Sequence, residues 1–179
     1  MTPPAGETAL RLKLTELPEM HPCLLWNDIL AAAVAVLERD AANRSYPAFL
    51  QVQEIPGYGS DEVSLEIVGA GVPRGDVAKV RRTYESHRLV ELAAIAIAGL
   101  ALFCSGGHQI RDVSLRGTSA DYLIDDQRYL LEVAGRSRKC DSSAAWNERW
   151  RRLAEGSTAG FYLSVTEFET PASRLGFGA

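Results

Sequence analysis

The sequence predicts a mixed α/β (α+β) protein that folds as one domain. The chain has 179 residues, and a single domain is usually ~100–200 residues long. Its composition is 46% hydrophobic and 23% charged, which is sufficient for a buried core and excludes a disordered chain. Short segments that alternate polar and apolar residues are interspersed with longer apolar segments, so both strands and helices are expected.

Residues 1–75 are expected to form an N-terminal β/α extension that belongs to the same domain. Leu10, Leu12 and Leu14 alternate with polar residues, as in a half-buried strand. A segment rich in alanine and leucine then predicts a helix, and glycines predict a turn between two later strands. The expected order is strand, helix, strand and strand, over residues 8–17, 24–39, 48–55 and 62–68.

Residues 76–166 are expected to form the core, in the order α-β-β-β-α-β. Asp76 is a suitable N-cap for the first helix, and Trp146 and Trp150 lie on the apolar stripe of the second. The helices are expected over residues 76–103 and 141–155, and the strands over 109–115, 119–125, 128–135 and 159–166. Residues 167–179 contain proline and glycine and are expected to be an irregular tail.

The charge balance is mildly acidic. Nineteen lysines and arginines stand against 23 aspartates and glutamates, which gives a formal net charge of −4. This balance excludes a uniformly basic coat for nucleic acid, although a local basic patch remains compatible with it.

The cysteines and the apolar segments indicate whether a zinc site is present and in which cellular compartment the protein lies. The three cysteines form no CxxC pair or Cys/His cluster, which argues against a structural zinc site and favours reduced thiols in the cytoplasm. The N-terminus lacks the basic and apolar regions of a secretory signal. The apolar stretch 92–104 is shorter than the ~20 residues of a membrane span, so a buried helix and no membrane contact are expected.

Two carboxylates are predicted to face each other across a hairpin. If residues 126–127 form a two-residue loop, the pairing places Asp121 opposite Glu132, with Cβ atoms about 4.5–5.5 Å apart. Opposed carboxylates repel each other unless a cation lies between them, and a hard divalent metal would satisfy both. The alternative is that the register differs by one residue, or that both acids are solvated at the rim of the sheet.

The pattern Ser119-Ala-Asp121 followed by Leu130-Leu-Glu132-Val-Ala134 resembles the PD-(D/E)XK motif of the restriction-endonuclease-like nuclease superfamily. That family has an α-β-β-β-α-β core, with the first acid on the second core strand and the acid-x-lysine triplet on the third. The resemblance covers residues 76–166, about half of the chain. It implies a restriction-endonuclease-like fold.

Carried onto this sequence, the resemblance implies that Asp121 and Glu132 bind Mg²⁺ or Mn²⁺. Many family members add a glutamate from the first core helix, and Glu85 is preferred here over Glu91. The family's lysine is replaced by Ala134, which can neither orient water nor offset charge in the transition state. Arg136 is the candidate substitute, since arginine binds phosphate well although it is a poor proton shuttle.

A basic segment follows the two carboxylates. Residues 136–152 contain six basic and two acidic side chains, a local balance of +4. The functional interpretation is contact with nucleic-acid phosphates, and the alternative is a solvated amphipathic helix. The candidate nucleic-acid-binding residues are Arg136, Arg138, Lys139, Arg149 and Arg152.

Two functions are therefore expected, from different classes. The first is a nuclease-like protein that engages DNA or RNA and, if active, hydrolyses phosphodiesters with Mg²⁺ or Mn²⁺. The second is a catalytically inactive nuclease fold that serves as a binding or assembly subunit of a multi-protein DNA-processing or defence system. Either protein would act in the cytoplasm, as a homodimer or as a subunit of a larger complex. A third interpretation, a small α/β protein with unrelated ligand chemistry, follows if the hairpin register is wrong.

Overall fold

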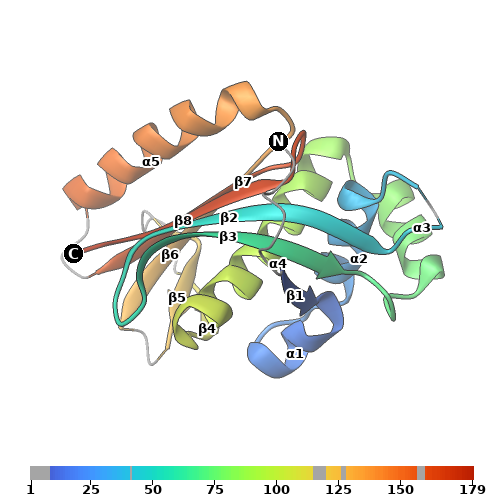
Figure 1. Ribbon diagram of the computed structural model, residues 1–179, viewed down its shortest axis with the longest axis horizontal. Helices are drawn as coiled ribbons and strands as arrows, with labels where there is room; N and C mark the ends of the chain where they lie inside the picture. The colour runs from blue at the N-terminus through green and yellow to red at the C-terminus, as the bar shows by residue number, and fades with distance from the viewer. Residues whose placement is uncertain (1–8, 41, 115–119, 126–127, 157–159) are drawn as a thin grey trace.

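A computed structural model of the protein describes residues 9–40, 42–114, 120–125, 128–156 and 160–179. Within these residues, eight strands form one mixed sheet in the order β1-β3-β2-β8-β7-β6-β5-β4, and five α-helices accompany it, of which α4 and α5 make the main contacts with the strands (Figure 1). The predicted mixed α/β class is therefore confirmed.

The elements follow the chain in the predicted order, with additions at both ends. The strands are β1 (Leu10–Lys13), β2 (Ser45–Ile55), β3 (Gly59–Val68), β4 (Ile110–Val113), β5 (Tyr122–Ile124), β6 (Tyr129–Arg136), β7 (Phe161–Glu167) and β8 (Ala172–Gly178). The α-helices are α1 (Leu17–Met20), α2 (Asn27–Leu37), α3 (Arg74–Thr83), α4 (Ser86–Gly106) and α5 (Ser142–Gly156).

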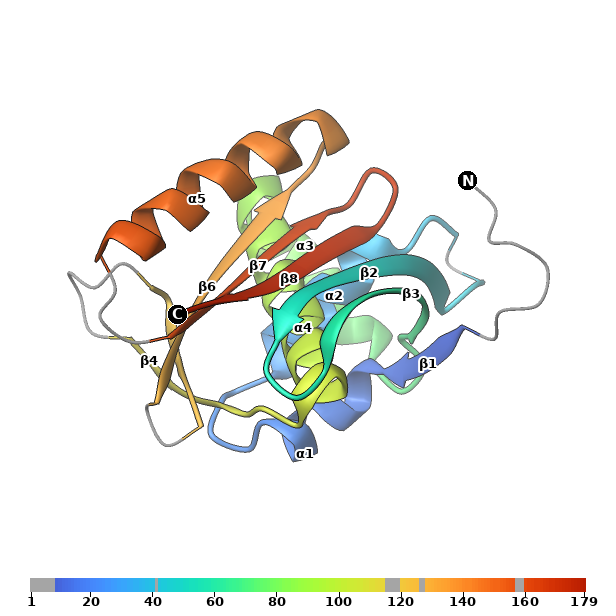
Figure 2. The same ribbon diagram turned by 60° about the vertical axis from the view of Figure 1, so that its left-hand side comes forward.

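The sheet separates two helical layers. The helices α1 to α4 lie on one side of it, and α5 lies alone on the other, above β6 and β7 (Figures 1 and 2). Strands β4, β5 and β6 form an antiparallel meander, whereas β6 and β7 are parallel and are connected through α5. This crossover places α5 over one face of β6 and β7, with Arg149 and Arg152 next to Glu132 of β6.

The helix α4 is the central core element. Its length and composition would allow it to span a membrane, but most of its residues are buried inside the protein. It contacts β2, β6, β7 and β8 on one side and α2 on the other, which explains why residues 92–102 are apolar in every direction. The expectation of a buried core helix is confirmed.

The single helix predicted over residues 76–103 is wrong in one respect, because it is divided in two. Tyr84 and Glu85 adopt extended backbone conformations between α3 and α4. The Tyr84 hydroxyl donates a hydrogen bond of 2.6 Å to Asp28 at the start of α2. Pro73, rather than Asp76, is the N-cap of α3. The break lets the polar α3 pack against α2 while the apolar α4 continues beneath the sheet.

The tail is a strand, so the prediction of an irregular segment over residues 167–179 is wrong. The buried Glu167 carboxylate accepts hydrogen bonds from the backbone N–H groups of Glu169 (2.9 Å) and Thr170 (3.1 Å), which fixes the turn after β7. The returning strand β8 pairs with β7 on one side and β2 on the other. At Gly176 an added Cβ would lie 2.8 Å from the Trp146 ring, so glycine there lets α5 approach the sheet.

The first predicted strand is shorter than expected. Only Leu10–Lys13 form β1, which pairs in parallel with β3, and the chain then turns into a short helical segment that ends at Met20. His21 follows and is fully buried. Its Nδ1 accepts the backbone N–H of Ile110 (3.0 Å) and its Nε2 bonds to the Gly99 carbonyl (2.9 Å), so the neutral imidazole connects α1, α4 and β4.

The contact between α4 and β6 depends on Gly135. A Cβ at this position would lie 2.4 Å from the carbonyl oxygen of Val90. We expect Gly135→Ala to reduce the free energy of unfolding by about 1–3 kcal/mol, because the helix and strand would have to separate. Gly75→Ala in α3 is the control, since no heavy atom lies within 4 Å of its Cβ position. Equal stability of both variants in urea unfolding would contradict the close approach.

The buried His21 predicts a pH-dependent stability. Burial lowers the pKa of His21 below its ordinary value, and the hydrogen bond to Gly99 only partly offsets this effect. As the pH drops below about 6.5, His21 is protonated in the unfolded chain but stays neutral in the folded chain. The free energy of unfolding therefore falls as the pH falls. The slope should approach 1.4 kcal/mol per pH unit at most.

The measurement is urea unfolding between pH 7.5 and pH 5, a window of about one unit or more on each side of the ordinary histidine pKa. His21→Gln should be less stable at neutral pH but should lose the histidine-dependent slope. His87→Gln, at an exposed position, should keep the slope of the unaltered protein. A slope that persists in His21→Gln would assign the effect to other groups.

Candidate functional site

The hairpin of β5 and β6 has the predicted register over the residue pairs that the structure describes. Tyr122 lies opposite Leu131, and Ile124 lies opposite Tyr129. The predicted loop, residues 126–127, lies outside the described residues, as do residues 115, 119 and 159 at the ends of neighbouring predicted strands. The register is therefore confirmed up to the residue next to each carboxylate.

At Asp121 the ladder changes. Its backbone N–H donates to the carbonyl of Leu131 (2.9 Å), one residue out of step with the preceding pairs. Its carboxylate Oδ2 accepts the backbone N–H of Val133 at 2.9 Å, in the place of a strand partner. Beyond Leu131, β6 has no strand neighbour on the β5 side among the described residues. Asp121 thus stands at the point where the edge of β6 opens.

Glu132 is buried beneath α5 and its charge is balanced there. Its Oε1 accepts hydrogen bonds from Arg149 and Arg152, one turn apart on α5, and these arginines are 26% and 51% exposed. Burial raises the pKa of Glu132, and Asp121 adds to this effect, whereas the two arginines lower it. The cation expected between the carboxylates is therefore supplied to Glu132 by guanidinium groups.

A hollow of about 340 Å³ opens beside Asp121, between α4, the β4–β6 meander and α5. It is the meeting point of three arginines, two carboxylates and a set of apolar side chains. Its lining includes Arg88, Glu91, Asp121, Arg136 and Arg149, together with Ile95, Val113, Tyr122, Val133, Ala134 and Gly135. Arg88 and Glu91 form an ion pair of 3.0 Å across one turn of α4.

The structure brings Glu91, and not Glu85, to the hollow. Glu85 precedes α4 as its N-cap, its side chain is 84% exposed, and it pairs with His87 at 3.3 Å. Helical geometry explains the difference, because Glu91 lies one turn from Arg88 and one turn from Ile95 on the same face of α4. The preferred third ligand therefore lies outside the site.

The donor set does not fit a divalent metal. Within the described part of the chain, no group of three or more histidine, cysteine or carboxylate side chains gathers where a metal could bind. Glu132 is engaged by two arginines, and Val133 uses one of the Asp121 oxygens. Mg²⁺ is usually bound by one or two carboxylates with waters and substrate oxygens, and cationic guanidinium groups beside the carboxylates oppose its binding.

No family model matches the chain. Comparisons with curated proteins and with solved structures find no match either. The functional argument therefore depends on the geometry of the site.

The lysine position of the nuclease motif holds a packed residue. Ala134 is buried in a cluster with Ala145, Trp146 and Leu153 of α5, so no basic group occupies this position. Arg136, the predicted substitute, lines the hollow and donates through Nη1 to the Gly135 carbonyl (2.7 Å). It has no carboxylate partner among the described residues.

The basic segment divides into residues that bond Glu132 and residues that lie on the surface away from it. Arg149 and Arg152 bond Glu132, whereas Arg138, Lys139 and Arg151 are exposed. Arg138 pairs with Asp141 at 3.2 Å, an exposed contact that contributes little and leaves the charge accessible.

Both tryptophans of α5 pack on the sheet, as the apolar stripe predicted. Their rings stack at 5.2 Å, and Arg174 lies over the Trp146 ring at 3.9 Å from its centre. These indoles stabilise the helix–sheet interface and are not exposed for base stacking.

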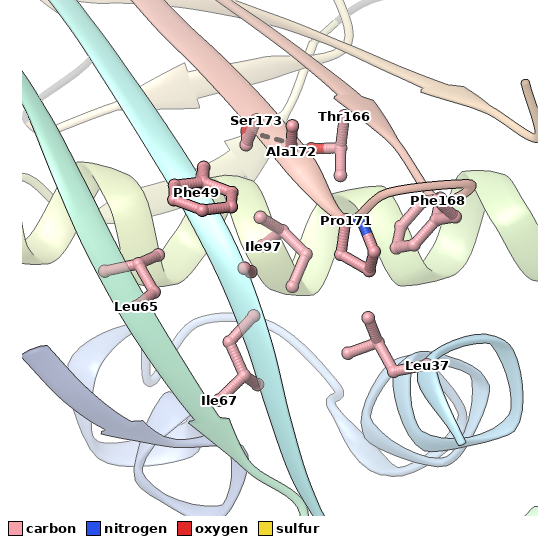
Figure 3. A pocket seen from close by; sticks show the side chains of 11 residues that line it. Leu37, Phe49, Leu65, Ile67, Ile97, Thr166, Phe168, Pro171, Ala172 and Ser173 are labelled. Atoms are coloured by element: carbon pink, nitrogen blue, oxygen red, sulfur yellow. Dashed lines mark hydrogen bonds between the residues drawn. The ribbon is translucent and has the colours of Figure 1, made fainter. Parts of the chain in front are cut away.

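A second hollow lies between β2, the turn after β7, α2 and α4, and it is apolar (Figure 3). Leu37, Ile67, Ile97 and Phe168 are among the side chains that point into it. Its volume of about 10 Å³ matches a single water molecule, so it is a packing defect and not a ligand site.

Sequence reasoning missed a hydrogen-bonded series of polar side chains beside β5, formed by Asp125, His108 and Tyr162. His108 bonds through Nδ1 to Asp125 (2.8 Å) and through Nε2 to the Tyr162 hydroxyl (2.9 Å). Burial raises the pKa of Tyr162, which keeps the phenol neutral. The three residues come from separate elements and no sequence spacing connects them.

Arg88, in the hollow beside Asp121, was missed too, although its i,i+3 spacing to Glu91 was a usable signal.

The Glu132–Arg149 pair predicts an asymmetric loss of stability. Arg149→Ala leaves a buried carboxylate with one remaining arginine. We expect a loss of about 2 kcal/mol, between the ~0–1 kcal/mol of surface pairs and the ~3–5 kcal/mol of fully buried ones. Adding Glu132→Gln to Arg149→Ala should recover part of the loss, since no unbalanced charge remains. Arg151→Ala is the exposed control, and a similar loss in both single variants by urea unfolding would contradict the assignment.

Proposed function

We propose that this protein is a nuclease-like binding module that engages nucleic acid without hydrolysing it. The order α4-β4-β5-β6-α5-β7 supports a restriction-endonuclease-like core, since the PD-(D/E)XK resemblance implies this order. Asp121 stands next to the second core strand and Glu132 lies on the third, as the resemblance requires.

The observation that carries the proposal is the engagement of Glu132 by Arg149 and Arg152. In a metal-dependent nuclease this carboxylate would have to be available to the cation. Here it is buried and neutralised by two arginines, and Ala134 removes the basic group that would activate water. Both features favour binding or assembly over hydrolysis, and they disfavour Mg²⁺ or Mn²⁺ as a resident cofactor.

The exposed basic side chains support nucleic acid as the partner. Arg138 and Lys139 follow β6, Arg151 lies on α5, and all three side chains are exposed. Guanidinium and ammonium groups at such positions bind phosphates regardless of sequence, so DNA and RNA are both candidate ligands. A cytoplasmic role as a homodimer, or as a subunit of a DNA-processing or defence complex, is part of the same proposal.

The test combines cleavage and binding. Single- and double-stranded DNA and RNA are incubated with the protein in Mg²⁺, Mn²⁺ or EDTA, and binding is measured by fluorescence anisotropy at several salt concentrations. We expect no metal-dependent cleavage and salt-sensitive binding. Lys139→Ala/Arg151→Ala should weaken binding and reduce the slope of log K against log salt by up to about two.

Lys79→Ala/Arg82→Ala on α3 is the matched control. It removes the same charges, also from exposed positions, on the opposite side of the sheet from α5. Equal weakening by both double variants would show a non-specific charge effect. Metal-dependent cleavage that disappears in Asp121→Ala would overturn the non-hydrolytic part of the proposal, and no binding at any salt concentration would overturn the nucleic-acid part.

A further inference from the structure

The hollow beside Asp121 is lined partly by charged and partly by apolar side chains. At about 340 Å³ it falls within the ~300–1,000 Å³ range of small-molecule sites. The close approach of Gly135 to Val90 aligns the first turns of α4 with the end of β6. The lining includes the charged Arg88 and Arg136 and the apolar Ile95 and Val133.

The apolar part of the lining includes one exposed side chain and one aromatic side chain. Val113 is 61% exposed at the edge strand β4, and Tyr122 is half-buried on β5. Burial raises the pKa of Tyr122 to about 12, so its ring carries a neutral phenol at physiological pH. Such a wall suits a flat, partly apolar group of the size of a nucleobase.

The polar part of the hollow holds both paired and unpaired charges. Three arginines and two carboxylates line it, and Arg149 is already engaged by the buried Glu132. Glu91 is paired with Arg88, and the guanidinium of Arg136 has no carboxylate partner within the described residues. An arginine that is half-buried and without a counter-charge is a strong donor for phosphate, because its planar fork binds two oxygens at once.

Asp121 adds an acceptor to the site. A carboxylate has two oxygens, and the N–H of Val133 uses Oδ2. A carboxylate at this position can accept a hydrogen bond from an exocyclic amino group of a base. The hollow therefore presents an anion site, an apolar wall and an acceptor within one small volume.

We propose that this hollow binds a single nucleotide unit, with its phosphate at Arg136 and its base against the apolar wall of Tyr122 and Val113. The unit has two sources with the same chemistry, a free nucleoside monophosphate and the 5′-phosphorylated end of a strand. The second source rests on the proposed function, and the first does not.

The test is isothermal titration with the four nucleoside monophosphates, the matching nucleosides and inorganic phosphate. We expect a nucleotide to bind more tightly than its nucleoside or phosphate alone. Arg136→Gln should weaken that binding at least tenfold, and Tyr122→Leu should weaken it severalfold. Arg82→Gln is the matched control, at an exposed position on α3 outside the hollow, and it should stay within about twofold. Circular dichroism and thermal unfolding check that each variant is folded.

Oligonucleotides distinguish the two sources. Tighter binding of a 5′-phosphorylated strand than of its 5′-hydroxyl form, with displacement by the nucleotide, supports the strand end. Nucleotide binding without any effect of the 5′-phosphate supports the free nucleotide.

Two results would overturn the inference and leave the proposed function standing. The first is strand binding that depends on Lys139 and Arg151 while no nucleotide binds. The second is inorganic phosphate that binds as tightly as any nucleotide. Absence of both nucleotide and strand binding would overturn this inference and the proposed function together.

Discussion

The pairing of β8 with both β7 and β2 is the constraint on which the rest of the fold depends. Without it, β2 and β7 would each leave backbone N–H and C=O groups unpaired beside the core, which is costly when no water replaces the partner. With it, the N-terminal strands and the meander become one sheet. That continuous sheet gives α4 a surface long enough to bury its whole apolar length, and it places α5 above β6 and β7.

The position of α5 then determines the chemistry of the site. Gly176 lets Trp146 approach the sheet, and this contact fixes the rotation of the helix so that Arg149 and Arg152 face Glu132. A buried carboxylate with two guanidinium partners is a stable arrangement, whereas one with a single partner leaves an unbalanced charge. The same packing that orders the helix thus makes Glu132 unavailable to a divalent cation.

Local patterns predicted much of the fold from the sequence. The short loop predicted the β5–β6 register, and the tryptophan stripe predicted α5 and its buried face. The tail was missed because glycine weakens a strand on its own, whereas Gly176 is required there by the indoles of Trp146 and Trp150 above it. The charge partners of Glu132 were missed because they come from a helix 17 and 20 residues away, and only the crossover brings them together.

The open edge of β6 has a consequence for how molecules of this protein meet each other. An unpaired strand edge is a template on which a second chain can add a strand and aggregate. Here the carboxylate of Asp121 occupies the N–H of Val133, and the guanidinium of Arg136 occupies the carbonyl of Gly135. Two charged side chains thereby occupy two of the hydrogen-bonding groups of this edge and make it a poorer partner for a neighbouring strand. The residues that border the hollow thus also oppose edge-to-edge strand pairing between copies.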